Sequence, residues 1–323
     1  MKAEARRRKA EGGRQSGAPR RVLTAFCLLL SAYCLLAAGA AAQKRPKPAL
    51  KESDARRAIA EARGLALRTG AVRVLEVSAA GAAPVTVRAE VTLGLRLARI
   101  ADERAGGGFL APKRWRAVEL RVGDREWEDF DILARALGAE RVEAARRSVE
   151  EAVKEFEARV AVAGKGATVE PLTRGALTIK QLSALGSSAV AEVSVEATFR
   201  LEGGVGRRWQ AAEVSVAGEP GVELAAVAES MNTLKAARAR EEMGEIAAAL
   251  EKFRRERGLY VVAESEVVLM DHLSPRFIRR AVRIDPWHRP YRYAGARDSF
   301  TISSDGADGK RGTPDDLTLN SGR

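Results

Sequence analysis

The sequence has very little histidine and cysteine. Its 323 residues include two histidines, His272 and His288, and two cysteines, Cys27 and Cys34. Both cysteines lie in one apolar segment near the start, so the rest of the chain has no thiol for a disulfide, a metal site or a nucleophile. No pair of carboxylates stands out as an acid and base. We therefore expect a protein that is not an enzyme.

Aromatic residues are also scarce, and the positive charge is not spread evenly. Only 5% of the residues are aromatic, so a core must consist mainly of Val, Leu, Ala and Ile. The formal net charge is +12, and the first 21 residues, with eight basic and two acidic side chains, supply half of it. Proteins that bind nucleic acid gather their basic side chains in one patch. The mixed signs in the remaining chain argue against nucleic-acid binding.

An uncharged stretch follows this basic start, from Val22 to Ala42. A basic segment, an apolar core and small residues at its end are features of an export signal. We therefore predict a signal peptide over residues 1–42. The alternative is an uncleaved anchor that contacts the membrane through residues 22–42. Both interpretations export the rest of the chain, which is then periplasmic, anchored in the inner membrane facing the periplasm, or secreted. The Pro- and Lys-rich segment 43–50 is predicted to be an extended linker.

The middle of the chain contains an internal repeat. Residues 70–97 align with 175–201, and RWRAVEL at 114–120 aligns with RWQAAEV at 208–214. A helical pattern precedes each copy, over about 52–67 and 139–160, and the following segments alternate apolar and polar residues as antiparallel strands do. We predict an α+β fold with two repeat units, 51–138 and 139–221. Each unit is expected to be a helix packed on about three strands of its own.

This order of elements resembles cystatin-like and nuclear-transport-factor-like domains, although no motif is shared. Folds of this type include enzymes, binding proteins and scaffolds, so the fold does not select the function. The resemblance implies one alternative function, a periplasmic protein that binds a small ligand in a pocket near Trp115 or Trp209.

The last part of the chain, residues 222–323, carries the most specific motifs. A helix is predicted from residue 222 until Gly258 ends it, and GLY, DPWHRPYRY and SDGADGKRG…DD follow in that order. Together these motifs, over residues 238–319, resemble the C-terminal domain of the major pseudopilin of type II secretion systems. The resemblance implies a long helix followed by a small β-hairpin and a loop. The residues of the aromatic turn motif are Asp285, Pro286, Trp287, Pro290, Tyr291 and Tyr293.

The closing loop brings three aspartates, Asp308, Asp315 and Asp316, into one short glycine-rich excursion. Close carboxylates repel each other unless a cation lies among them, and Ca²⁺ prefers carboxylate and carbonyl oxygens. From the residues alone, a calcium site and a solvated acidic loop both remain open. The pseudopilin resemblance implies calcium, with Asp308 and Asp315 or Asp316 as ligands and Ser304 or a neighbouring carbonyl completing the shell.

The chain also departs from the pseudopilin pattern. It lacks the short leader with a GFTLxE-type processing site, the segment before Met243 is polar, and His288 stands where the family usually has glycine. Polymerisation into a standard filament is therefore not what we expect. We predict a non-enzymatic envelope protein with a calcium-stabilised C-terminal head, whose partners are other cell-envelope or secretion-system proteins.

Overall fold

The computed structural model describes residues 50–62, 67–78, 84–101, 113–122, 127–164, 168–203 and 208–321. The predicted signal peptide or anchor, and the predicted linker except for Leu50, lie outside these residues. Within the described ranges, no helix combines the length and the apolar character that a membrane span requires.

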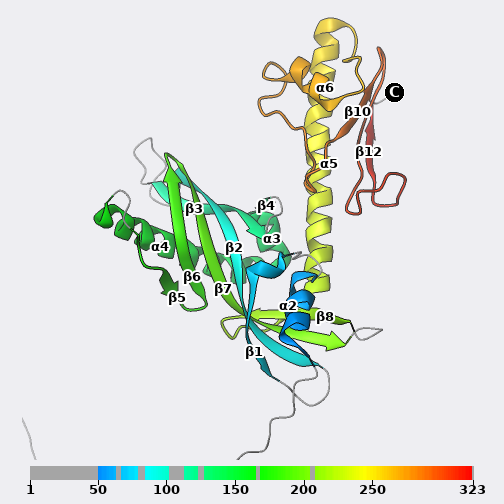
Figure 1. Cartoon of the computed structure of the whole chain (residues 1–323). Helices are drawn as coiled ribbons and strands as arrows, with labels where there is room; N and C mark the ends of the chain where they lie inside the picture. Colours follow the sequence, from blue (N-terminus) through cyan, green and yellow to red (C-terminus); the bar gives the residue numbers. More distant parts are fainter. Residues whose placement is uncertain are drawn as a thin grey trace, which may run out of the picture. The chain divides into compact units, whose positions relative to one another are not determined.

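The repeat region forms one antiparallel sheet, in which nine strands are described (Figure 1). Its strands are β1 (Val72–Ser78), β2 (Val85–Ala101), β3 (Lys113–Val122), β4 (Glu128–Asp129), β5 (Leu172–Arg174), β6 (Leu177–Leu185), β7 (Ser188–Gly203), β8 (Trp209–Val216) and β9 (Val222–Glu223). The helices of this region are α2 (Glu52–Ala60), the 3₁₀ turn η1 (Thr69–Ala71), α3 (Phe130–Leu137) and α4 (Ala139–Ala163).

The two repeats are related by an approximate twofold axis at the centre of this sheet. The long strands β2 and β7 pair there, and Val91 lies opposite Val195, its counterpart in the second repeat. Along its other edge β2 pairs first with β1 and then with β3. In the same way β7 pairs with β6 and then with β8. The two repeats also share an ion pair at equivalent positions. It is formed by Arg96 and Glu119 in the first repeat and by Arg200 and Glu213 in the second.

Two buried clusters lie under the two helices, and each cluster contains strands from both repeats. Ile59 of α2 packs with Val87 of β2 and Phe199 of β7, whereas Phe156 of α4 packs with Leu97 of β2 and Val193 of β7. The expectation of a helix on its own three strands is therefore wrong. A 17-residue strand such as β2 is about 55 Å long, which is longer than the part of a strand that one of these helices can cover. Each long strand therefore contributes residues to the core under both helices.

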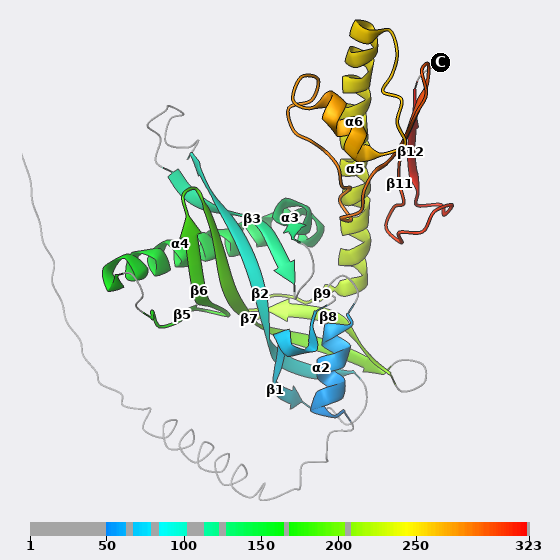
Figure 2. The ribbon, with the colours of Figure 1, turned by 45° about the horizontal axis from the view of Figure 1, so that its top comes forward.

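The C-terminal part, here called the head, is built on the long helix α5 (Leu224–Arg257). This helix starts directly after β9 and ends at Gly258, whose φ of +77° is a left-handed helix cap that favours glycine. Around its C-terminal half lie α6 (Glu266–Leu273) and a small sheet (Figure 2). The predicted apolar stripe of α5 is confirmed as part of the buried core, and its members are Met243, Ile246, Leu250 and Phe253.

The small sheet of the head has three antiparallel strands rather than the predicted two. They are β10 (Arg292–Gly295), β11 (Phe300–Ser304) and β12 (Leu317–Asn320), in the order β10-β11-β12. The third strand follows the aspartate loop and is only four residues long, too short to show an alternating pattern in the sequence. Because β12 pairs with β11, both ends of the aspartate loop are held by the sheet.

Candidate functional site

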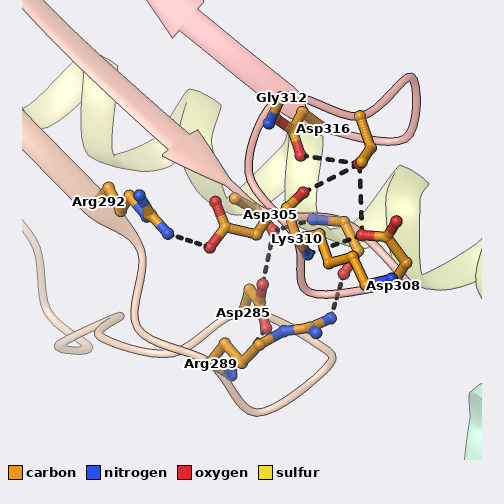
Figure 3. A network of polar contacts seen from close by, with 11 residues as sticks. Asp285, Arg289, Arg292, Asp305, Asp308, Lys310, Gly312 and Asp316 are labelled. Carbon is orange, nitrogen blue, oxygen red and sulfur yellow. Dashed lines mark hydrogen bonds and ion pairs between the residues drawn. The ribbon is translucent and has the colours of Figure 1, made fainter.

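Asp285 connects the aromatic turn to the small sheet. Asp285 is buried, with only 2% of its surface exposed. Its Oδ1 accepts hydrogen bonds from the backbone N–H groups of Trp287 and Arg289, both at 2.9 Å, and its Oδ2 accepts from the Ser304 hydroxyl at 2.5 Å. A bridge between Ile284 and Pro290 closes the turn. The carboxylate therefore fixes the turn and the end of β11 to each other (Figure 3).

The aromatic residues of the motif anchor the turn to the rest of the head. The Tyr291 hydroxyl donates to Glu242 of α5 at 2.9 Å, and Tyr293 donates to the Val261 carbonyl at 2.6 Å. Trp287 Nε1 donates to Asn232 of α5 at 3.0 Å. Burial raises the pKa of Tyr291, and the negative charge of Glu242 raises it further. These side chains are engaged in packing and hydrogen bonding, so their role in the head is structural.

The three predicted aspartates do come together, around a residue that the sequence did not single out. The hydroxyl oxygen of Thr313 is 2.6 Å from Asp315 Oδ1, 3.3 Å from Asp308 Oδ1 and 3.5 Å from Asp316 Oδ1. It also lies 3.0 Å from the Lys310 carbonyl. The hydrogen bond from Thr313, followed by that from the Asp308 backbone N–H, lowers the pKa of Asp315. The loop thus gathers four oxygen acceptors around one hydroxyl.

Backbone N–H groups and two arginines shape this loop. Asp308, Asp315 and Asp316 accept hydrogen bonds from the backbone N–H groups of Lys310, Asp308 and Gly312 respectively. At the start of the loop Arg289 donates to the Gly306 carbonyl, and Arg292 forms an ion pair with Asp305 (Figure 3). Both arginines belong to the DPWHRPYRY segment, where the sequence pattern drew attention to the aromatic residues instead.

Ser304 lies in a different environment from the three aspartates. It is buried, its hydroxyl donates to Asp285, and it accepts the Gly306 backbone N–H at 3.3 Å. Among the described residues, no hydrogen bond joins Ser304 to Asp308, Asp315 or Asp316. Its contacts are those of a buried link between the turn and the sheet.

The chemistry of the loop suits a hard cation, although the side chains are not arranged as a finished site. Carboxylate and carbonyl oxygens are the donors that Ca²⁺ takes. The Thr313 hydroxyl has one proton and can satisfy only one of the oxygens around it. Within the described ranges, no group of three or more His, Cys, Asp or Glu side chains has the arrangement of a metal site.

A long helix that carries a small three-stranded sheet, a buried Asp-Pro-Trp turn and an aspartate loop defines this head as pseudopilin-like. Residues 226–320 match the family model of the type II secretion system (T2SS) protein G. This match confirms the resemblance expected for the C-terminal domain, and it covers less than a third of the chain. No curated protein and no solved structure matches the chain.

Proposed function

We propose that this protein is an exported, non-enzymatic component of the cell envelope that acts by contacting other secretion-system proteins. The observation that carries the proposal is the family match over residues 226–320, a family whose members are structural components of secretion machinery. The geometry supports it, because the aromatic turn is used to hold the head together. In this interpretation the head and the repeat sheet are both interaction modules.

The contact between α5 and the repeat sheet supports this interpretation over assembly into a standard filament. The side chain of Lys235, in the N-terminal half of α5, is only 7% exposed and lies 2.6 Å from Glu128 of β4. His288 of the aromatic turn approaches the same carboxylate at 3.7 Å. One side of the helix is thus covered by the chain's own repeat region. A helix packed in this way is less available to pack against helices of other subunits.

Photo-crosslinking in cells tests the proposed partners. A photoreactive amino acid at Val267, which is exposed on α6, is expected to form crosslinks to secretion-system proteins. The same amino acid at Leu185, which is exposed in the repeat sheet, tests separately whether that module contacts the same proteins. Absence of any crosslink from the head to a secretion-system component, at normal expression, would contradict the proposal.

We further propose that calcium stabilises the head through Asp308, Asp315, Asp316 and a nearby carbonyl, without Ser304. When bound, the ion would supply positive charge among the three carboxylates. Calcium at 100 times its dissociation constant is expected to stabilise the head by about 2.7 kcal/mol and to raise its melting temperature. Asp308→Ala should remove this increment, whereas Asp298→Ala, an exposed aspartate outside the loop, should keep it. The calcium proposal is wrong if protein that has been freed of metal with a chelator, and then of the chelator, shows no rise in melting temperature when calcium is added.

For the small-ligand alternative, a pocket of about 360 Å³ borders Trp115, but the tryptophan itself is already engaged by the chain's own side chains. That residue is 5% exposed, its indole N–H donates to Glu157 at 2.7 Å, and Arg99 lies over its ring. Buried clusters also fill the space between the sheet and both helices. The surroundings of the second tryptophan, Trp209, are different and lead to a separate inference.

A further inference from the structure

The two repeats place a tryptophan at the same position but give it different neighbours. In the pairing of β2 with β3, Arg99 lies opposite Trp115. In the pairing of β7 with β8, Gly203 lies opposite Trp209. The approximate twofold axis relates these two pairs, so each site serves as a reference for the other. The second repeat therefore lacks the arginine that the first repeat provides.

In the first repeat this arginine engages the tryptophan, and the pocket that remains beside the two residues has a volume of about 360 Å³. The Arg99 guanidinium carbon lies 4.6 Å from the centroid of the Trp115 ring, a cation–π contact. Glu157 of α4 accepts the indole N–H at 2.7 Å and also forms an ion pair with Arg99. A planar cation thus covers the indole face, and a carboxylate oxygen satisfies its N–H.

In the second repeat the equivalent space is an open groove of about 610 Å³. Trp209 is only partly buried, and among the described residues its indole N–H has no hydrogen-bond partner. The buried alanines Ala58, Ala62 and Ala211 also line the groove. Its charged lining residues are Glu61, Glu202, Glu223, Arg200 and Arg208. Among the described residues, no cation lies over the Trp209 ring, although Arg200 and Arg208 line the groove.

We propose that this groove binds an arginine side chain of a partner polypeptide, with its guanidinium over the Trp209 ring. The first repeat shows which groups complete such a site: a planar cation on the ring and an acceptor for the indole N–H. The guanidinium suits this role better than an ammonium group because it is planar and stacks on aromatic faces. A backbone carbonyl of the same partner segment would accept the indole N–H.

The charges of the groove are consistent with a cationic ligand. Arg200 is already paired with Glu202 at 2.6 Å and with Glu213 at 2.7 Å. Among the described residues, Glu61 and Glu223 form no ion pair and are exposed at the groove, where together they outnumber the remaining arginine, Arg208. The proposal deepens the role of the repeat sheet as an interaction module, but it does not rest on the family match or on calcium. Its failure would leave both of those proposals in place.

Titration of the full chain with a blocked Gly-Arg-Gly peptide tests the proposal. The readout is the indole ¹H–¹⁵N signal of Trp209, assigned with a Trp209→Phe variant. We expect this signal to shift with the arginine peptide, while the Trp115 signal stays in place. The same peptide with citrulline, which keeps the shape but lacks the charge, should shift it at least tenfold less at equal concentration. No shift, or an equal shift with citrulline, overturns the proposal.

A designed variant provides an independent check. A Cβ atom at Gly203 would meet no heavy atom within 4 Å, so Gly203→Arg can place a guanidinium where the first repeat has Arg99. This variant should fill the groove and weaken the arginine peptide at least tenfold, whereas Gly203→Gln, similar in length but uncharged, should weaken it less. Unchanged Trp115 signals confirm folding. If Gly203→Arg binds the peptide as well as the parent chain does, the proposal is wrong; if it fails to fold, the citrulline comparison decides.

Discussion

Replacing Asp285 with alanine is expected to destabilise the head by about 3–5 kcal/mol, the largest effect that we expect among the substitutions considered in the aromatic turn and the aspartate loop. The carboxylate accepts the backbone N–H groups of Trp287 and Arg289 and the hydroxyl of Ser304. Because Asp285 is 2% exposed, water cannot replace these acceptors. One buried and two partly buried donors would lose their partner at once, and the turn would separate from β11.

Hydrogen exchange of the β11 amides in increasing urea measures this effect on the head alone. Asp285→Asn keeps one carbonyl oxygen for the two backbone N–H groups, and it should cost about 1–2 kcal/mol. Asp271→Ala, which removes an exposed aspartate with a 3.5 Å ion pair to Arg283, should change stability by less than about 0.5 kcal/mol. Equal losses for Asp285→Ala and Asp271→Ala would show that the buried carboxylate does not hold the turn.

Gly295→Ala is expected to be nearly as damaging, for a steric reason. A Cβ atom there would lie 2.1 Å from the Val261 carbonyl oxygen and 2.3 Å from the Tyr293 hydroxyl. Neither atom moves easily, because Tyr293 donates to that carbonyl and the Gly295 N–H donates to the Ala263 carbonyl at 2.8 Å. Forcing a methyl group into such a contact costs about 1–3 kcal/mol or more. Thermal unfolding of the head should shift to a clearly lower temperature.

The matched control for this variant is Gly244→Ala in the middle of α5. A Cβ atom at Gly244 would meet nothing within 4 Å, and alanine favours a helix over glycine by about 0.5–1 kcal/mol. The same chemical change should therefore stabilise the chain at one position and destabilise it at the other. If both variants melt at the parent temperature, the close approach at Gly295 is not a constraint on the head.

Much of the head could be predicted from the sequence because its signals are local. The apolar stripe of α5 and the stop at Gly258 predicted a helix over 222–257, and the structure has one from Leu224 to Arg257. The aspartates were expected close together because they lie within nine residues of each other. The role of Thr313 was missed, since a lone threonine carries no pattern. The placement of Ser304 beside Asp285 was missed because it depends on pairing between distant segments.

The sequence by itself predicted an internal repeat of helix and strands in the middle of the chain, and it determined that the end carries a pseudopilin-like set of motifs. It did not determine which strands pair. Alternating apolar residues show that a segment is a strand and which face is covered, but the partner of an edge is set by contacts between residues far apart in the chain. Only the tertiary structure joined β2 to β7, mixed the two repeats in one sheet, and placed an arginine over Trp115 but none over Trp209 among the described residues.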